Sequence, residues 1–259
     1  MSPPGNLTAS TLVRLAGGEP PAPTLALVAA VALHEAVSVF LPPLPSGVRG
    51  SDAAASRPTA EAGHPLPTLS LEGEGLHALL IKWPNDLLLG GVKLSGILLE
   101  RADDAVVVGF GVNLAHHPVD LDRAATSLAA FSGNAPDPDT FLAVLADSFA
   151  RWLHRWRQEG LAPILTAWLA RAHPIGTGLT VRTPSPSPFV LSAVEGRAAI
   201  ATPAPRTSTA LSANGEGGAQ DDALQGLFDG LDASGALRLR LADGSVRVIH
   251  AADVFMIQD

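Results

Sequence analysis

A predicted β-hairpin between residues 79 and 100 constrains the fold of this 259-residue chain more than any other segment. Residues 79–83 form a short apolar run that is typical of a buried strand. Pro84 ends this run, because proline has no backbone N–H to give to a strand ladder. The apolar run resumes at residues 87–89, and Gly90 and Gly91 can then adopt the positive φ angles of a tight hairpin turn. A return strand is therefore predicted to end at Glu100.

Polar residues within this hairpin indicate chemistry. Lys82 and Lys93 lie inside the apolar strands, and Asn85 and Asp86 occupy the position of a turn. A solvated lysine on a surface hairpin is the ordinary interpretation. Gly96 in mid-strand favours a binding site instead, because glycine there often marks the close approach of a ligand or another backbone. Side-chain alternation predicts two opposite faces, one with Lys93, Ser95 and Ile97 and the other with Leu94, Gly96 and Leu98.

A second glycine-containing strand is predicted at residues 105–114, where the pattern Gly109-x-Gly111-x-Asn113 follows the hairpin. Glycines in a strand can simply mark a bulge or tight packing. Two alternate positions without side chains would also let a flat ligand lie against the backbone. Asn113 could then bind that ligand or hold the end of the strand, and the sequence favours neither role.

An apolar helix is predicted at residues 24–40. A membrane-spanning helix needs about 20 apolar residues, and this run is shorter and contains His34 and Glu35. We therefore expect a buried helix of a globular core, which the hydrophobic content of 47% would support.

A longer amphipathic helix is predicted to start at Asp137, with Asp137 as the N-cap and Pro138 in the first turn, and to end at Gly160. Its apolar residues recur at helical spacing and are expected to face the core: Phe141, Leu145, Phe149, Trp152 and Trp156. A shorter helix is predicted at residues 161–172.

The pattern changes to short strands after residue 174, which predicts a larger domain at 1–174 and a C-terminal domain at 175–259. The strands of the C-terminal domain are expected to form a small antiparallel barrel from residues 178–182, 225–231, 236–241 and 245–249. Two segments rich in Pro, Ser, Ala and Gly, at about 42–75 and 183–222, are predicted to be disordered inserts.

These motifs resemble those of the biotin protein ligases, which attach biotin to a lysine of a carrier protein. The resemblance rests on Lys-Trp-Pro-Asn-Asp at 82–86, on residues 93–100, and on the Gly-x-Gly-x-Asn strand. Residues 226–237 and the pair Asp253-Val254 are similar to the C-terminal domain of that family. The resemblance implies an α+β fold, in which a mixed sheet packs against helices and is followed by a small SH3-like β-barrel domain.

The resemblance implies two half-reactions, with ATP and biotin as substrates and Mg²⁺ arriving with ATP rather than at a dedicated metal site. Lys93 matches the key lysine of the family, and its ammonium could stabilise the charge that builds on the α-phosphate. Asp86 could orient or deprotonate the incoming amine, or it could simply form the turn.

The remaining implied substrate-binding positions have alternative structural roles. Lys82 and Asn85 could hold the phosphates or shape the turn, and Trp83 could stack on adenine or pack beneath the sheet. The other positions implied to contact biotin or ATP are Gly96, Gly109, Gly111 and Asn113, together with Lys93 itself.

The expected partner is the biotin carboxyl carrier protein of a carboxylase, and the resemblance also allows a homodimer. A net charge of −8 argues against a nucleic-acid partner, and no membrane association is expected. The absence of cysteine suits a cytoplasmic protein. Residues 2–10 match a segment that follows a Gly/Arg-rich adenylate loop in the family, so an N-terminal truncation without that loop or a DNA-binding domain is expected. Alternatives are a non-catalytic remnant that binds biotin or carrier, and a lipoate ligase.

Overall fold

The computed structural model describes residues 4–42, 79–119, 124–182 and 223–257. Apart from Pro42, the two predicted inserts lie outside these residues. The elements are β1 (Leu7–Arg14), the 3-10 helix η1 (Ala22–Thr24), α1 (Leu25–Phe40), β2 (Leu79–Lys82), β3 (Asp86–Leu89), β4 (Val92–Ala102), β5 (Ala105–Val112), α2 (Leu128–Ser132), α3 (Pro138–Glu159), α4 (Ala162–Leu169), β6 (Gly178–Arg182), β7 (Ala223–Leu231), β8 (Leu237–Arg240), β9 (Val246–Ile249) and β10 (Asp253–Met256).

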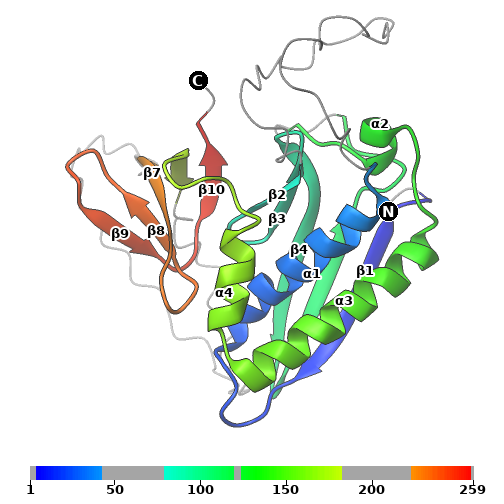
Figure 1. Ribbon diagram of the computed structural model, residues 1–259, viewed down its shortest axis with the longest axis horizontal. Helices are drawn as coiled ribbons and strands as arrows, with labels where there is room; N and C mark the ends of the chain where they lie inside the picture. The colour runs from blue at the N-terminus through cyan, green and yellow to red at the C-terminus, as the bar shows by residue number, and fades with distance from the viewer. Residues whose placement is uncertain (1–3, 43–78, 120–123, 183–222, 258–259) are drawn as a thin grey trace, which may run out of the picture.

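The first sheet has the strand order β1-β5-β4-β3-β2, and each of its neighbouring strands is antiparallel. Helices α1 and α3 lie across one face of this sheet (Figure 1). The predicted α+β class is therefore confirmed. Among the described residues, parallel pairing in this sheet is limited to isolated bridges between Ile81 and Ala172 and between Lys93 and Ala125, so its ladders are antiparallel rather than mixed.

The core lies between this sheet and the two helices. Helix α3 is capped at Asp137, whose side chain accepts a hydrogen bond from the Thr140 N–H, and the whole predicted apolar stripe is buried. The segment Ala22–Phe40 has the length and apolar character of a membrane span, but most of it is buried within the fold. The predicted buried helix is thus confirmed, because α1 packs between α3, α4 and the sheet.

A β-bulge in the hairpin changes the predicted direction of Lys93. In the register of β3 and β4, Leu87 pairs with Ser95 and Leu88 pairs with Lys93, so Leu94 is an extra residue. One extra residue turns the side chains of the residues before it in the strand to the opposite face of the sheet. The prediction that Lys93 shares a face with Ser95 and Ile97 is therefore wrong. Its side chain lies on the face of Gly96, and an added Cβ on Gly96 would be 3.4 Å from Lys93 Nζ.

The second sheet has the strand order β10-β6-β7-β8-β9, also antiparallel. Helix α4 lies between this sheet and α1 (Figure 1). Trp168 of α4 contacts Phe228 of β7 with a ring-centroid distance of 6.4 Å. A Cβ on Gly235 would come within 2.7 Å of Leu27 Cδ1, so the turn before β8 packs closely on α1. The strands predicted here are present, and the domain division at residue 174 stays a prediction.

Candidate active site

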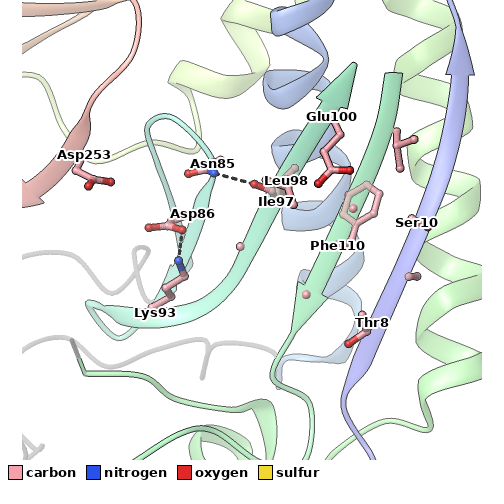
Figure 2. Close-up of a pocket in the computed structure, with 15 residues that line it drawn as sticks. Thr8, Ser10, Asn85, Asp86, Lys93, Ile97, Leu98, Glu100, Phe110 and Asp253 are labelled. Carbon is pink, nitrogen blue, oxygen red and sulfur yellow. Dashed lines mark hydrogen bonds and ion pairs between the residues drawn. The ribbon is translucent and has the colours of Figure 1, made fainter. Parts of the chain in front are cut away.

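A cavity of about 680 Å³ lies on the face of the first sheet that points away from the helices. Strands β1, β4 and β5 form its base, and Asn85, Asp86, Lys93 and Asp253 line one side (Figure 2). The other side carries Thr8 and Ser10 of β1. The cavity therefore draws on residues from both sheets.

The base of the cavity is a patch without side chains, which we call the glycine floor: Gly96, Gly109 and Gly111. Strand register places Gly96 directly opposite Gly111, and Gly109 beside them opposite Leu98. An added Cβ would be 3.9 Å from its nearest non-neighbouring atom at Gly111 and 3.7 Å at Gly109. Packing within the protein does not require glycine at these two positions. Their small size instead leaves room for a flat ligand above the backbone, as the strand pattern predicted.

A group of three charges adjoins the glycine floor. Asp86 forms ion pairs with both lysines. Its Oδ1 is 2.5 Å from Lys93 Nζ, and its Oδ2 is 2.9 Å from Lys82 Nζ. Asp86 and Lys82 are buried, whereas the Lys93 side chain is 41% exposed. The exposed ammonium of this group is therefore that of Lys93, which the bulge turns toward the cavity.

The electrostatic environment fixes the ionisation of Asp86. Burial by itself would raise the pKa of this carboxyl, but the charges and hydrogen bonds of Lys82 and Lys93 outweigh it and hold the pKa below 3.8. Asp86 is consequently a carboxylate at neutral pH. A carboxylate with a lowered pKa is a weak base, so this geometry favours orientation of an ammonium over removal of its proton.

Asn85 lines the cavity, but its amide is committed to the backbone. Its Nδ2 donates to the Ile97 carbonyl at 2.7 Å, and its own carbonyl accepts the Ile97 N–H at 2.9 Å. These two bonds hold the turn against β4. The structure therefore shows the turn-shaping role, which was one of the two alternatives for Asn85.

Three predicted substrate contacts lie outside the cavity lining. Trp83 is 3% exposed, and its Nε1 donates to the Gly235 carbonyl at 3.1 Å, so it packs against the C-terminal sheet. Lys82 is buried between Asp86 and β10. Asn113 donates to the Thr126 carbonyl at 3.0 Å and so holds the strand end. Each of these side chains has a structural role in place of a substrate contact, because tertiary contacts occupy its polar atoms.

Four polar residues of the lining were not predicted: Thr8, Ser10, Glu100 and Asp253. Glu100 could have been found from alternation, since it follows Gly96 and Leu98 at even spacing on β4. Thr8 and Ser10 alternate in the same way on β1. Asp253 comes from β10, more than 150 residues after the hairpin, and only the docking of the second sheet brings it here.

Comparison with known proteins gives two family matches along the chain. Residues 1–113 match the biotin/lipoate A/B protein ligase family, and residues 218–256 match the biotin protein ligase C-terminal domain. The chain is 35% identical over 263 residues to the biotin–[acetyl-CoA-carboxylase] ligase of Paracoccus denitrificans, covering 98% of this chain and 81% of the relative. A ligase of the same name from Mycobacterium tuberculosis is 38% identical over 105 residues, which are 40% of this chain and 39% of that protein.

Solved structures have the same fold. The biotin protein ligase from Aquifex aeolicus in complex with biotin and ATP superposes with a TM-score of 0.62 at 17% identity, covering 98% of this chain and 79% of that one. The apo structure of the Aquifex ligase gives a TM-score of 0.60 at 16% identity. Sequence identity over nearly the whole chain, together with both family matches, leads to one conclusion. The chain belongs to the biotin protein ligase family of enzymes.

Proposed function

We propose that this protein activates biotin as biotinyl-AMP with ATP and then transfers biotin to a lysine of a biotin carboxyl carrier protein. The observation that carries the proposal is the placement of the Lys93 ammonium beside the glycine floor, where it is held by a buried carboxylate. A flat ring system can rest on the floor while its charged group reaches Lys93.

In the first half-reaction a biotin carboxylate oxygen forms a bond to the α-phosphorus, and the bond from that phosphorus to the bridging oxygen breaks to release pyrophosphate. The carboxylate and the phosphate repel each other, and negative charge builds on the phosphoryl oxygens. An ammonium fixed beside them offsets both effects. Lys93 is suited to this task because its pairing with Asp86 holds the side chain toward the cavity.

In the second half-reaction the amine nitrogen of the carrier lysine attacks the acyl carbon, the bond to the AMP oxygen breaks, and the amine loses a proton. Asp86 is paired with Lys93, and Asp253 lines the same cavity (Figure 2). They can attract and orient an incoming ammonium. The low pKa of Asp86 makes water or phosphate the better final proton acceptor.

The charge of the cavity favours Mg-ATP over free ATP. The residues that line it include the carboxylates of Asp86, Glu100 and Asp253, against the single ammonium of Lys93. A polyphosphate at such a site needs further positive charge. Mg²⁺ bound to the nucleotide would supply it, since Mg²⁺ commonly enters a site with substrate phosphates.

Biotin-dependent exchange of pyrophosphate into ATP tests the first half-reaction. Exchange is expected for the wild type, and a rate lower by about 10²- to 10³-fold is expected for Lys93→Ala, because a preorganised charge at the transition state is lost. Arg14→Ala is the matched control, since it removes a cation from an exposed ion pair with Asp104. Its exchange rate should equal that of the wild type.

Four outcomes would contradict the proposal or redirect it. Exchange that does not need biotin, or that survives in Lys93→Ala, would refute the assigned chemistry. Exchange with lipoate in place of biotin would make the protein a lipoate ligase. Biotin binding by calorimetry without any exchange would indicate a non-catalytic binder. Transfer is tested separately, by mass spectrometry of a purified carrier domain.

A further inference from the structure

The chain contains two lysines, Lys82 and Lys93, and both bind the same carboxylate, that of Asp86. The other 15 of its 17 basic residues are arginines. An ammonium is compact and directs three N–H donors out of any single plane, whereas the five N–H donors of a guanidinium all lie in one plane. Lysine is thus found where one small cation must serve several acceptors.

Lys82 has two such acceptors in a buried position. Its Nζ donates to Asp86 Oδ2 at 2.9 Å and to the carbonyl of Val254 at 2.9 Å, and the residue is 8% exposed. The first bond lies within the hairpin, and the second reaches strand β10 of the C-terminal sheet. The neighbour of Val254 is Asp253, which lines the cavity near Asp86 and Asn85 (Figure 2).

We propose that Lys82 is a positioning residue of the active site, which orients Asp86 and at the same time ties β10 to the hairpin so that Asp253 is presented to the cavity. The proposal rests on the proposed adenylation reaction. It assigns to Lys82 an action through Asp86, and it gives the C-terminal sheet a direct part in completing the site.

The geometry explains how the effect would reach Lys93. Asp86 Oδ2 is held by Lys82, so Oδ1 is left to hold Lys93. Without Lys82, both carboxylate oxygens could turn to Lys93, and the Val254 carbonyl would lose its bond in a buried setting. Lys93 would then be less well placed, and β10 would be less firmly docked.

The charged groups around Asp86 give a readout that a purely structural role would not move. Asp86 is faced by Lys82 from β2 and by Lys93 from β4, while Asp253 of β10 lines the same cavity. Lys82 contributes the largest of the effects that lower the Asp86 pKa. Removal of Lys82 leaves the burial, which raises the pKa, so the acid side of the pH–rate profile should move to higher pH.

The test compares Lys82→Met with Trp83→Phe in biotin-dependent pyrophosphate exchange over a range of pH. Trp83→Phe removes the neighbouring bond to the C-terminal sheet, from Nε1 to the Gly235 carbonyl, and does not touch Asp86. Lys82→Met should lower kcat by up to about 100-fold, because a small misplacement of a reacting group can cost that much. It should also shift the acid limb of the pH–rate profile to higher pH, whereas Trp83→Phe should leave that limb in place.

Hydrogen exchange provides a second measurement, which does not depend on activity. Lys82→Met should speed the exchange of amides in β10, and Trp83→Phe should speed it instead near Gly235. If Lys82→Met does not fold, Lys82→Arg keeps the charge and should retain the wild-type acid limb with a lowered kcat.

Several results would overturn the proposal. The first is a wild-type kcat and an unshifted acid limb of the pH–rate profile in Lys82→Met. The second is an equal shift of that limb in Trp83→Phe, and the third is unchanged amide hydrogen exchange in β10 of Lys82→Met. Failure of the adenylation assignment itself would appear differently, as an absence of pyrophosphate exchange in the wild type.

Discussion

Acidification is expected to destabilise this protein through His173, which lies beside the junction of the two sheets. The residue is 3% exposed and packs edge-on against Phe228 with a centroid distance of 4.3 Å. The pKa of His173 is lowered from 6.5 to about 4, mainly by burial and in smaller part by the nearby charge of Lys82. The folded protein therefore keeps this imidazole neutral in a pH range where the unfolded chain protonates it.

The magnitude follows from linkage. Because the folded pKa is the lower one, the unfolded state binds more protons between pH 6.5 and 4, and stability falls as pH falls through that window. A difference of about 2.5 pKa units corresponds to roughly 3 kcal/mol in full, of which about 2 kcal/mol is lost between pH 7 and pH 5. His34, whose pKa burial also lowers to about 4, adds a similar loss.

His173→Phe keeps an aromatic ring against Phe228 and removes the titration. Urea unfolding at pH 7, 6 and 5, followed by fluorescence of the four buried tryptophans, measures the effect. The wild type should lose about 4 kcal/mol between pH 7 and pH 5, and the variant only about 2 kcal/mol. His154→Gln, which removes an exposed histidine, is the control. If His173→Phe kept the full wild-type dependence on pH, the assignment of this loss to His173 would be refuted.

Two further predictions concern the site. Gly111→Ala adds a Cβ whose nearest non-neighbouring atom is 3.9 Å away, so the free energy of unfolding should stay within about 1 kcal/mol of the wild type. The increase in melting temperature that biotin with ATP gives the wild type should nevertheless be lost in this variant. An equal increase in the variant would contradict the glycine floor as the ligand surface. Gly17→Ala, at an open surface position, is the control. Self-biotinylation, mapped by peptide mass spectrometry, should be found at Lys93 or the N-terminal amine and not at Lys82, because Lys82 is buried and hydrogen-bonded. Label on Lys82 would show that its bonds open readily.

Local patterns in the sequence were sufficient to predict several elements of the fold. Glycines at the hairpin turn, the Asp137 N-cap and the apolar stripe of α3 depend on residues a few positions apart, and each prediction is confirmed. The glycine floor was also foreseeable, because side-chain alternation along β5 needs only the sequence of that strand.

The bulge in β4 shows where local reasoning stops. Alternation predicted one direction for Lys93, and a single unpaired residue reversed it. Whether a strand contains a bulge depends on how it pairs with its partner strand, and the pattern of apolar residues alone does not reveal that pairing. The identity of the key lysine was available from the sequence, and its direction was not.

Two features were predictable from the sequence because they arise from contacts between near neighbours: the hairpin with its two lysines and the glycine strand beside it. The α+β class was implied by the resemblance of these motifs to those of a known family. The packing of the two sheets, by contrast, brings Lys82 and Trp83 into contact with the C-terminal sheet and Asp253 to the cavity. Those contacts join residues more than 150 positions apart. Their geometry depends on how two separately formed sheets pack, and no local pattern encodes that arrangement.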